Sequence, residues 1–95
     1  MFYLNVWLTV QDPKDIPAVA DALTRAGAKS RTEPGCERWE AYHSQETPTQ
    51  FLLVEWWATK ADWETHREGE AVQQIYLKEV IPLVTRQAHP SELLQ

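Results

Sequence analysis

A histidine and several tryptophans lie close together in the middle of the sequence and have the side chains to act on an aromatic compound. Three of the five tryptophans fall within residues 55–66, a segment that ends on His66. Histidine titrates near neutral pH and is suited to act as a base. If this segment ends in a helix, Trp63 and His66 share one helical face. Trp57, at the end of the preceding strand, is placed to contact that face. The pattern is typical of a small-molecule pocket, although on these residues alone an ordinary core corner explains it better.

The residues around His66 predict a strand followed by a helix. Segment 51–57 is apolar, branched and aromatic, and it is too short for a lone helix, which favours a strand. Thr59 and Asp62 form a capping-box-like pair that predicts a helix start. On that helix, Asp62 and Glu70 lie four residues on either side of the histidine. They are the candidate carboxylates beside the imidazole ring, although a helix break at Gly69 would separate Glu70 from it.

The first strand has two different faces. Residues 2–10 alternate, so that one face is purely apolar and the other combines aromatic rings with hydrogen-bonding groups. Asn5 and Trp7 lie on this mixed face, which fits a binding surface and fits a half-wet sheet face equally well. After this strand, Asp15 predicts the N-cap of an amphipathic helix, and Gly27 predicts that this helix ends near that position.

The remaining elements complete a β-α-β-β-α-β order. They are a turn at 33–35, a strand at 36–43 that forms a hairpin with 51–57, a helix from Thr59 to about Val80 interrupted at Gly69, and a strand at 84–89 ended by Pro90. This order predicts one domain over residues 1–95, with the α+β ferredoxin-like fold.

The strand at 51–57 is apolar on both faces. One face carries Leu52, Val54 and Trp56, and the other carries Phe51, Leu53 and Trp57. A strand with two apolar faces is expected to be covered on both sides, whereas the predicted helices cover only one side of the sheet. A second copy of the chain is the economical cover for the other side. The sequence therefore predicts a homodimer.

Composition excludes several classes of partner. The formal net charge is −5 and there is no run of basic residues, which argues against nucleic acid and anionic membrane surfaces. No apolar run approaches the length of a membrane span. The first residues lack the basic region of a signal peptide and Cys36 is the single cysteine, so we expect a cytoplasmic protein. The three histidines lie far apart without ligand spacing, so no metal site is expected.

Three segments together resemble the antibiotic biosynthesis monooxygenase family. They are the turn S-R-x-E-P-G-C at 30–36, the strand 51–57 that ends in Glu-x-Trp, and Ala-x-x-x-x-His at 61–66. The resemblance covers roughly residues 2 to 85. It implies a dimeric α+β barrel in which the sheets of two ferredoxin-like subunits face each other. Each subunit would hold a pocket between its own sheet and its helices.

The resemblance implies oxidation of a quinol or a phenolic, polyketide-like aromatic by dioxygen, without a cofactor. The substrate, once deprotonated, would itself donate the electron that dioxygen needs. His66 is the candidate base, and Asn5 is a candidate amide donor for oxyanion charge. The candidate substrate-binding residues are Trp7, Trp57, Trp63 and Tyr76. The sequence leaves open which of Trp56 and Trp57 faces the pocket.

Two other functions stay open at this point. One is a dimeric protein that binds a small aromatic molecule without turnover. The other is a haem-handling relative, because the family includes enzymes that degrade haem. In those enzymes the resemblance implies a tryptophan at the position of His66 and an iron-ligating histidine at Tyr76, and only Asn5 matches. Both diagnostic residues differ, so haem degradation fits this chain less well.

Overall fold

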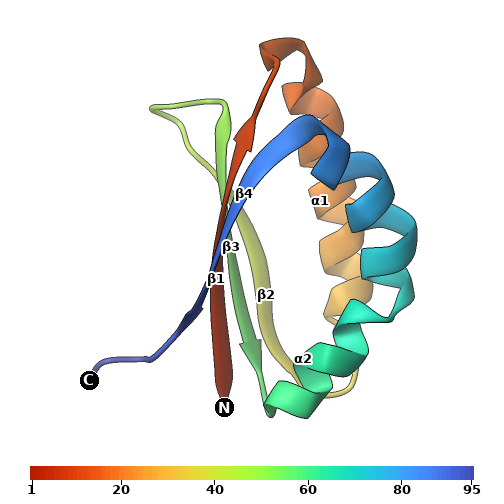
Figure 1. Ribbon diagram of the computed structural model, residues 1–95, viewed down its shortest axis with the longest axis vertical. Helices are drawn as coiled ribbons and strands as arrows, with labels where there is room; N and C mark the ends of the chain where they lie inside the picture. The colour runs from red at the N-terminus through yellow and green to blue at the C-terminus, as the bar shows by residue number, and fades with distance from the viewer.

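Four antiparallel strands form one sheet in the order β2-β3-β1-β4, and the helices lie on one side of it (Figure 1). The computed structural model describes all 95 residues. The elements along the chain are β1 (Phe2–Val10), η1 (Pro13–Asp15), α1 (Ile16–Ser30), β2 (Cys36–His43), β3 (Gln50–Trp57), α2 (Lys60–Arg67), η2 (Ala71–Val80), η3 (Ile81–Leu83) and β4 (Val84–Ser91). This is the α+β ferredoxin-like arrangement that the sequence predicted.

The core lies between the sheet and the helices. Alternation along β1 sends Leu4, Val6 and Leu8 inward, where each is at most 2% exposed. Phe51 and Leu53 of β3 lie on the same inner face and are also buried. Because side chains of a strand alternate between the faces of its sheet, the predicted apolar face of β1 becomes the packing face for the helices.

The opposite face of the sheet has no helix over it (Figure 1). Trp7 of β1 is 43% exposed there, and Val54 and Trp56 of β3 are half-buried. Tyr3 packs edge-on against Trp56, with ring centroids 5.4 Å apart. The prediction that the helices cover only one side of an apolar strand is therefore confirmed.

One predicted feature of the first helix is wrong, and another is confirmed in its position only. α1 does not end near Gly27 but continues to Ser30. The glycine is there because of packing, since a Cβ at this position would lie 2.9 Å from Cζ3 of Trp39. Asp15 occupies the predicted N-cap position, but its side chain makes no capping hydrogen bond. The side-chain cap lies earlier, at the start of η1, where the Asp12 carboxylate accepts a hydrogen bond from the Lys14 N–H.

The second half of the chain follows the prediction with two differences. The break at Gly69 is confirmed, but η2 beyond it is a wide π-type helix, which side-chain spacing does not distinguish from an α-helix. β4 runs past Pro90 to Ser91, whereas the sequence predicted that the proline ends it. Because β4 is an edge strand, a residue without an N–H is tolerated in it.

None of the helices combines the length and apolar composition that a membrane crossing requires.

The packing of Gly27 against Trp39 predicts the effect of adding a side chain. Gly27→Val forces a branched side chain against the indole ring, and we expect it to lower the free energy of unfolding by about 1–3 kcal/mol. Ala18→Val, at an exposed position of the same helix, controls for helix propensity and should cost only about 0.5 kcal/mol. Urea unfolding measures both. Equally small losses of unfolding free energy in both variants would show that the contact with Trp39 does not restrict the side chain at position 27.

Candidate active site

His66 lies at the centre of the candidate site, in the last turn of α2, the helix that follows β3 directly. The Thr59 hydroxyl accepts a hydrogen bond from the Asp62 N–H and caps α2, as predicted. The imidazole then packs on Trp57, with ring centroids 4.4 Å apart. The histidine is only 6% exposed, so its ring nitrogens need partners within the protein.

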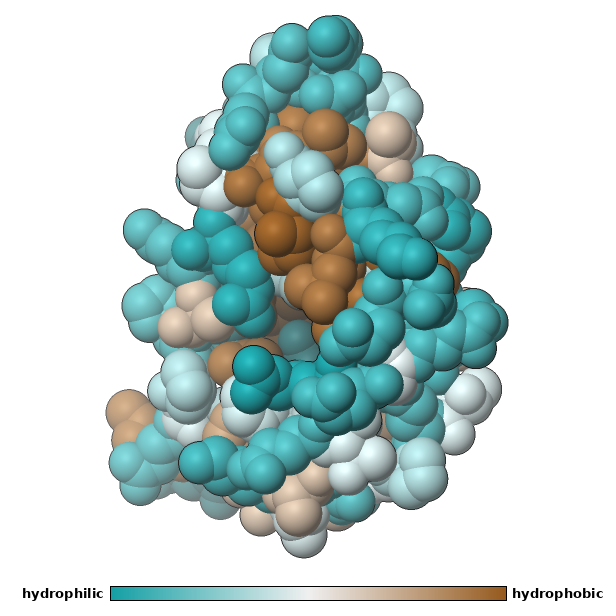
Figure 2. All heavy atoms as spheres, turned by 45° about the vertical axis from the view of Figure 1, so that its right-hand side comes forward, coloured by the Kyte–Doolittle hydropathy of each residue, from teal (hydrophilic) through white to brown (hydrophobic).

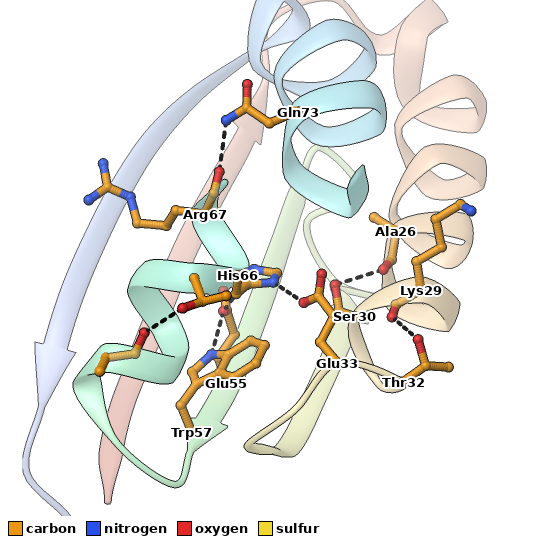
Figure 3. A network of polar contacts seen from close by, with 12 residues as sticks. Ala26, Lys29, Ser30, Thr32, Glu33, Glu55, Trp57, His66, Arg67 and Gln73 are labelled. Carbon is orange, nitrogen blue, oxygen red and sulfur yellow. Dashed lines mark hydrogen bonds and ion pairs between the residues drawn. The ribbon is translucent and has the colours of Figure 1, made fainter. Parts of the chain in front are cut away.

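Glu33 is the first of these partners. Its Oε1 lies 2.5 Å from His66 Nδ1 (Figure 3). The carboxylate reaches the ring because the turn after α1 packs on the first turn of α2. Gly35 in this turn has φ 79°, and a Cβ there would lie 2.2 Å from Asp62 Oδ2. A Cβ at Gly69 would lie 2.8 Å from Glu33 Oε2, so this carboxylate fits closely between the imidazole and the backbone.

The carboxylates that the sequence predicted beside His66 are elsewhere. Asp62 accepts a hydrogen bond from the Thr59 hydroxyl at the helix start. Glu70 lies beyond the break at the end of α2, where it pairs with Lys29 of α1 at 3.2 Å. Helical spacing brings Glu70 beside the histidine only on a continuous helix, and the break at Gly69, which the sequence indicated, ends that relation.

Glu55 of β3 is the second carboxylate near His66. Its Oε1 lies 3.8 Å from Nε2 of the histidine and accepts a hydrogen bond from Trp57 Nε1 at 3.1 Å (Figure 3). Glu55 is 5% exposed. Burial raises the pKa of this carboxyl, while the hydrogen bond from Trp57 and the nearby His66 oppose the rise. The His66 imidazole therefore lies between the Glu33 carboxylate, which contacts it closely, and the Glu55 carboxyl, whose pKa is raised by burial.

A cavity of about 310 Å³ opens beside this group, which is within the range of small-molecule sites. Its apolar lining consists of Leu4, Trp63, Val72, Leu77 and Ile81. Its polar lining consists of Glu55, His66, Arg67, Tyr76 and Arg86. In Figure 2 this side of the molecule carries an apolar patch bordered by hydrophilic side chains, with a hollow at its edge.

Two of the predicted substrate-binding residues line this cavity. Trp63 stacks on Phe2 with ring centroids 4.8 Å apart. The Tyr76 hydroxyl accepts a hydrogen bond from Arg86 Nε at 2.9 Å. Burial raises the pKa of this tyrosine, and the charge of Arg86 opposes the rise. Trp57 lies beneath the histidine, fully buried, and supports the site without lining the cavity.

Asn5 and Trp7 lie on the other side of the sheet from His66, so the structure does not bring them into the pocket. The Asn5 amide donates to the Ser91 hydroxyl of β4 at 3.1 Å. Trp7 lines a mostly polar hollow on the open face. The reason is strand alternation: Leu4 lines the cavity, so its neighbours in β1 point the opposite way. The same alternation turns Trp57 inward and Trp56 outward.

Four polar residues of the site were not predicted from the sequence, two glutamates and two arginines. Glu33 and Glu55 both lie within the motifs that carry the family resemblance. Glu55 also occupies an inward position of an otherwise apolar strand face, and a buried ionisable residue there is a signal of a functional site. Arg67 follows the histidine directly, and Arg86 lies in the last strand. Neither arginine has a local pattern that marks it. The chain holds no group of three or more His, Cys, Asp or Glu side chains arranged to bind a metal ion.

The raised pKa of Glu55 predicts a pH-dependent contribution to stability. The folded state binds the Glu55 proton more tightly than the unfolded state, so this contribution is present at low pH and lost as the pH rises through the raised pKa. Glu55→Gln removes the titration and still accepts a hydrogen bond from Trp57. We expect the variant to gain stability relative to the wild type as the pH rises from about 4 to about 8.

Urea unfolding across this pH range measures the difference in the free energy of unfolding. Glu46→Gln, an exposed carboxyl in the hairpin loop, is the matched control and should follow the wild type throughout. A difference between Glu55→Gln and wild type that does not change with pH would contradict the expected burial effect.

Comparison with known proteins gives the family. A family model described as antibiotic biosynthesis monooxygenase matches residues 1–76. No curated protein matches. A protein from Nitrosomonas europaea named as an antibiotic biosynthesis monooxygenase is similar, at 24% identity and a TM-score of 0.90, with 100% of each chain covered. A Bacteroides thetaiotaomicron protein of unknown function, described as a possible oxidoreductase, is 22% identical, with a TM-score of 0.85 over 97% of this chain and 96% of that chain.

At these identities the structural likeness establishes a shared fold. The family model covers most of the 95 residues, including the turn that carries Glu33 and the helix that carries His66. The chain therefore belongs to the antibiotic biosynthesis monooxygenase family.

Proposed function

We propose that this protein is a cofactor-independent monooxygenase or oxidase that acts on a quinol or a phenolic, polyketide-like aromatic. The observation that carries the proposal is the buried His66, which lines the cavity while its Nδ1 lies 2.5 Å from Glu33. In the proposed tautomer Nδ1 carries the proton and donates the hydrogen bond that the Glu33 carboxylate accepts. Nε2 then keeps a lone pair that can take a proton from a phenol. Membership of the family supports oxygen chemistry as the reaction that follows.

The surrounding side chains suit the remaining tasks of such a site. Trp63 offers an indole face beside the cavity for a planar ring. When it is protonated, the Glu55 carboxyl can donate a hydrogen bond to oxyanion charge, and burial raises its pKa. The Tyr76 hydroxyl is a second polar group on the cavity wall. In this proposal Glu55 takes the stabilising role that the sequence assigned to Asn5, which lies across the sheet.

The proposed chemistry balances with dioxygen as the sole oxidant. Proton removal turns the substrate into an electron-rich anion, which gives electrons to dioxygen. When an anthrone is oxidised, one oxygen atom replaces the two hydrogens of the central carbon, and the other leaves with them as water. When a quinol is oxidised, two electrons and two protons pass to dioxygen and yield quinone and hydrogen peroxide. Peroxide measurement distinguishes the two reactions.

Several features of the chain support a homodimer formed through the open sheet face. Trp7, Val54 and Trp56 lie there, with no element of the chain covering them. A second copy of the same face would bury these side chains symmetrically. We also propose that the protein works in the cytoplasm, which is supported by its single, free cysteine, Cys36.

His66→Ala tests the proposed base. We expect the wild type to consume oxygen above the autoxidation rate with anthrones or naphthohydroquinones, and His66→Ala to lose on the order of 10²-fold or more of this activity. The control is His43→Ala, an exposed histidine in the β2–β3 hairpin, which should keep full activity. An oxygen electrode measures uptake, and circular dichroism checks folding.

Two outcomes would overturn this role. Full activity in His66→Ala would exclude the histidine as the base. No uptake with any compound, together with quenching of the tryptophan fluorescence by the same compounds, would indicate a protein that binds aromatic molecules without turnover.

Val54→Asp tests the proposed dimer. This residue lies in the middle of the open sheet face, so a buried charge there should prevent association. We expect wild type to sediment with twice the chain mass of 11.0 kDa and Val54→Asp to sediment as a monomer. Ala18→Asp on exposed α1 should remain dimeric. A monomeric wild type at micromolar concentration would contradict the proposal.

A further inference from the structure

Two arginines without carboxylate partners line the same cavity. Arg67 ends α2 and Arg86 lies in β4, so they come from different elements. The ion pairs of the chain involve other basic residues: Arg25 is paired with Glu79, and Arg38 with Glu40. The charges on the pocket arginines are therefore not neutralised by any carboxylate within 4.0 Å.

Aromatic rings of the pocket hold both guanidinium groups in place. The guanidinium of Arg67 lies 5.0 Å from the centroid of the Trp63 ring. That of Arg86 lies 5.9 Å from the centroid of Tyr76, and its Nε donates to the tyrosine hydroxyl. Stacking restricts the orientation of each group while leaving most of its N–H donors free. Such restrained donors lose less entropy on binding a planar anion than a free lysine would.

The charge of Arg86 also acts inside the cavity. Burial raises the pKa values of Glu55 and Tyr76, and the charge of Arg86 opposes the rise in both. The chain as a whole carries a formal charge of −5, so its average field repels anions. Two unpaired positive charges at this one cavity are a local exception that favours an anionic ligand.

We propose that the pocket selects aromatic substrates that carry a carboxylate, with the carboxylate bound between Arg67 and Arg86 and the ring beside His66. This inference rests on the proposed function for the aromatic part of the ligand. The guanidinium groups supply charge-assisted hydrogen bonds to the carboxylate. The apolar wall and the Trp63 ring take the ring system, whose phenol then lies within reach of the imidazole. The pair of arginines thus determines which phenols enter and how they are oriented.

A matched pair of ligands tests this selectivity without turnover. The probes are 1-hydroxy-2-naphthoate and its neutral analogue 1-hydroxy-2-naphthamide, which share one ring system and one phenol. Calorimetric titration under anaerobic conditions gives both dissociation constants. We expect the carboxylate to bind about tenfold more tightly at low salt, and this preference to shrink as salt screens the charges.

Single substitutions then assign the preference to the arginines. Arg67→Gln and Arg86→Gln should each reduce the ratio of the two dissociation constants several-fold, because each variant removes one positive charge from the cavity wall. Arg67→Lys and Arg86→Lys keep the positive charge and should retain part of the preference for the carboxylate. Lys60→Gln removes one positive charge from the exposed start of α2, outside the cavity lining. This control should change neither the dissociation constant of the carboxylate nor that of the amide.

Three results would overturn the inference. They are equal affinity for both probes, no binding of either probe, and a preference that survives in both Gln variants. Failure of the proposed function is separate. Tight, arginine-dependent binding of the carboxylate without oxygen uptake would remove the enzyme and keep the anion site. Uptake with neutral quinols alone would keep the enzyme and remove the anion site.

Discussion

The hydrogen bond between Glu33 and His66 joins the two halves of the molecule at the candidate site. The imidazole is buried against Trp57, and leaving such a group without a partner costs about 1–3 kcal/mol. Its partner comes from a turn that precedes β2, far away in the sequence. The turn reaches α2 because Gly35 adopts a positive φ and brings the backbone against Asp62. The position of the imidazole thus depends on how this turn packs.

The chemistry of the pocket follows from one polar residue on an apolar strand face. Positions 51, 53, 55 and 57 of β3 all point inward, and only Glu55 among them is ionisable. Its carboxylate would be costly to bury alone. Trp57 and His66 lie near it and offset part of that cost. A buried, partly compensated carboxyl beside an imidazole is an arrangement typical of proton transfer, whereas either residue alone would be explained by folding.

The sheet separates two regions with different tasks. Its inner face holds the core and the cavity, and its outer face carries Trp7, Val54 and Trp56. Strand alternation imposes this division, because neighbouring residues of a strand cannot share a face. The division explains why the tryptophans of this chain do not form one slot. Trp57 and Trp63 belong to the site, while Trp7 and Trp56 belong to the open surface.

The sequence by itself determined the strands, the helix start at Thr59 and the family, because alternation, capping and motif spacing are local properties. It also placed Trp63 and His66 together, since helical spacing brings them to one face. Asn5 was predicted to act together with His66, although a pocket on the helix side of the sheet is lined by the apolar face of β1. Only the tertiary structure paired His66 with Glu33 and brought Arg86 to the cavity. Contacts between residues far apart in the chain depend on how the elements pack, which no local pattern specifies.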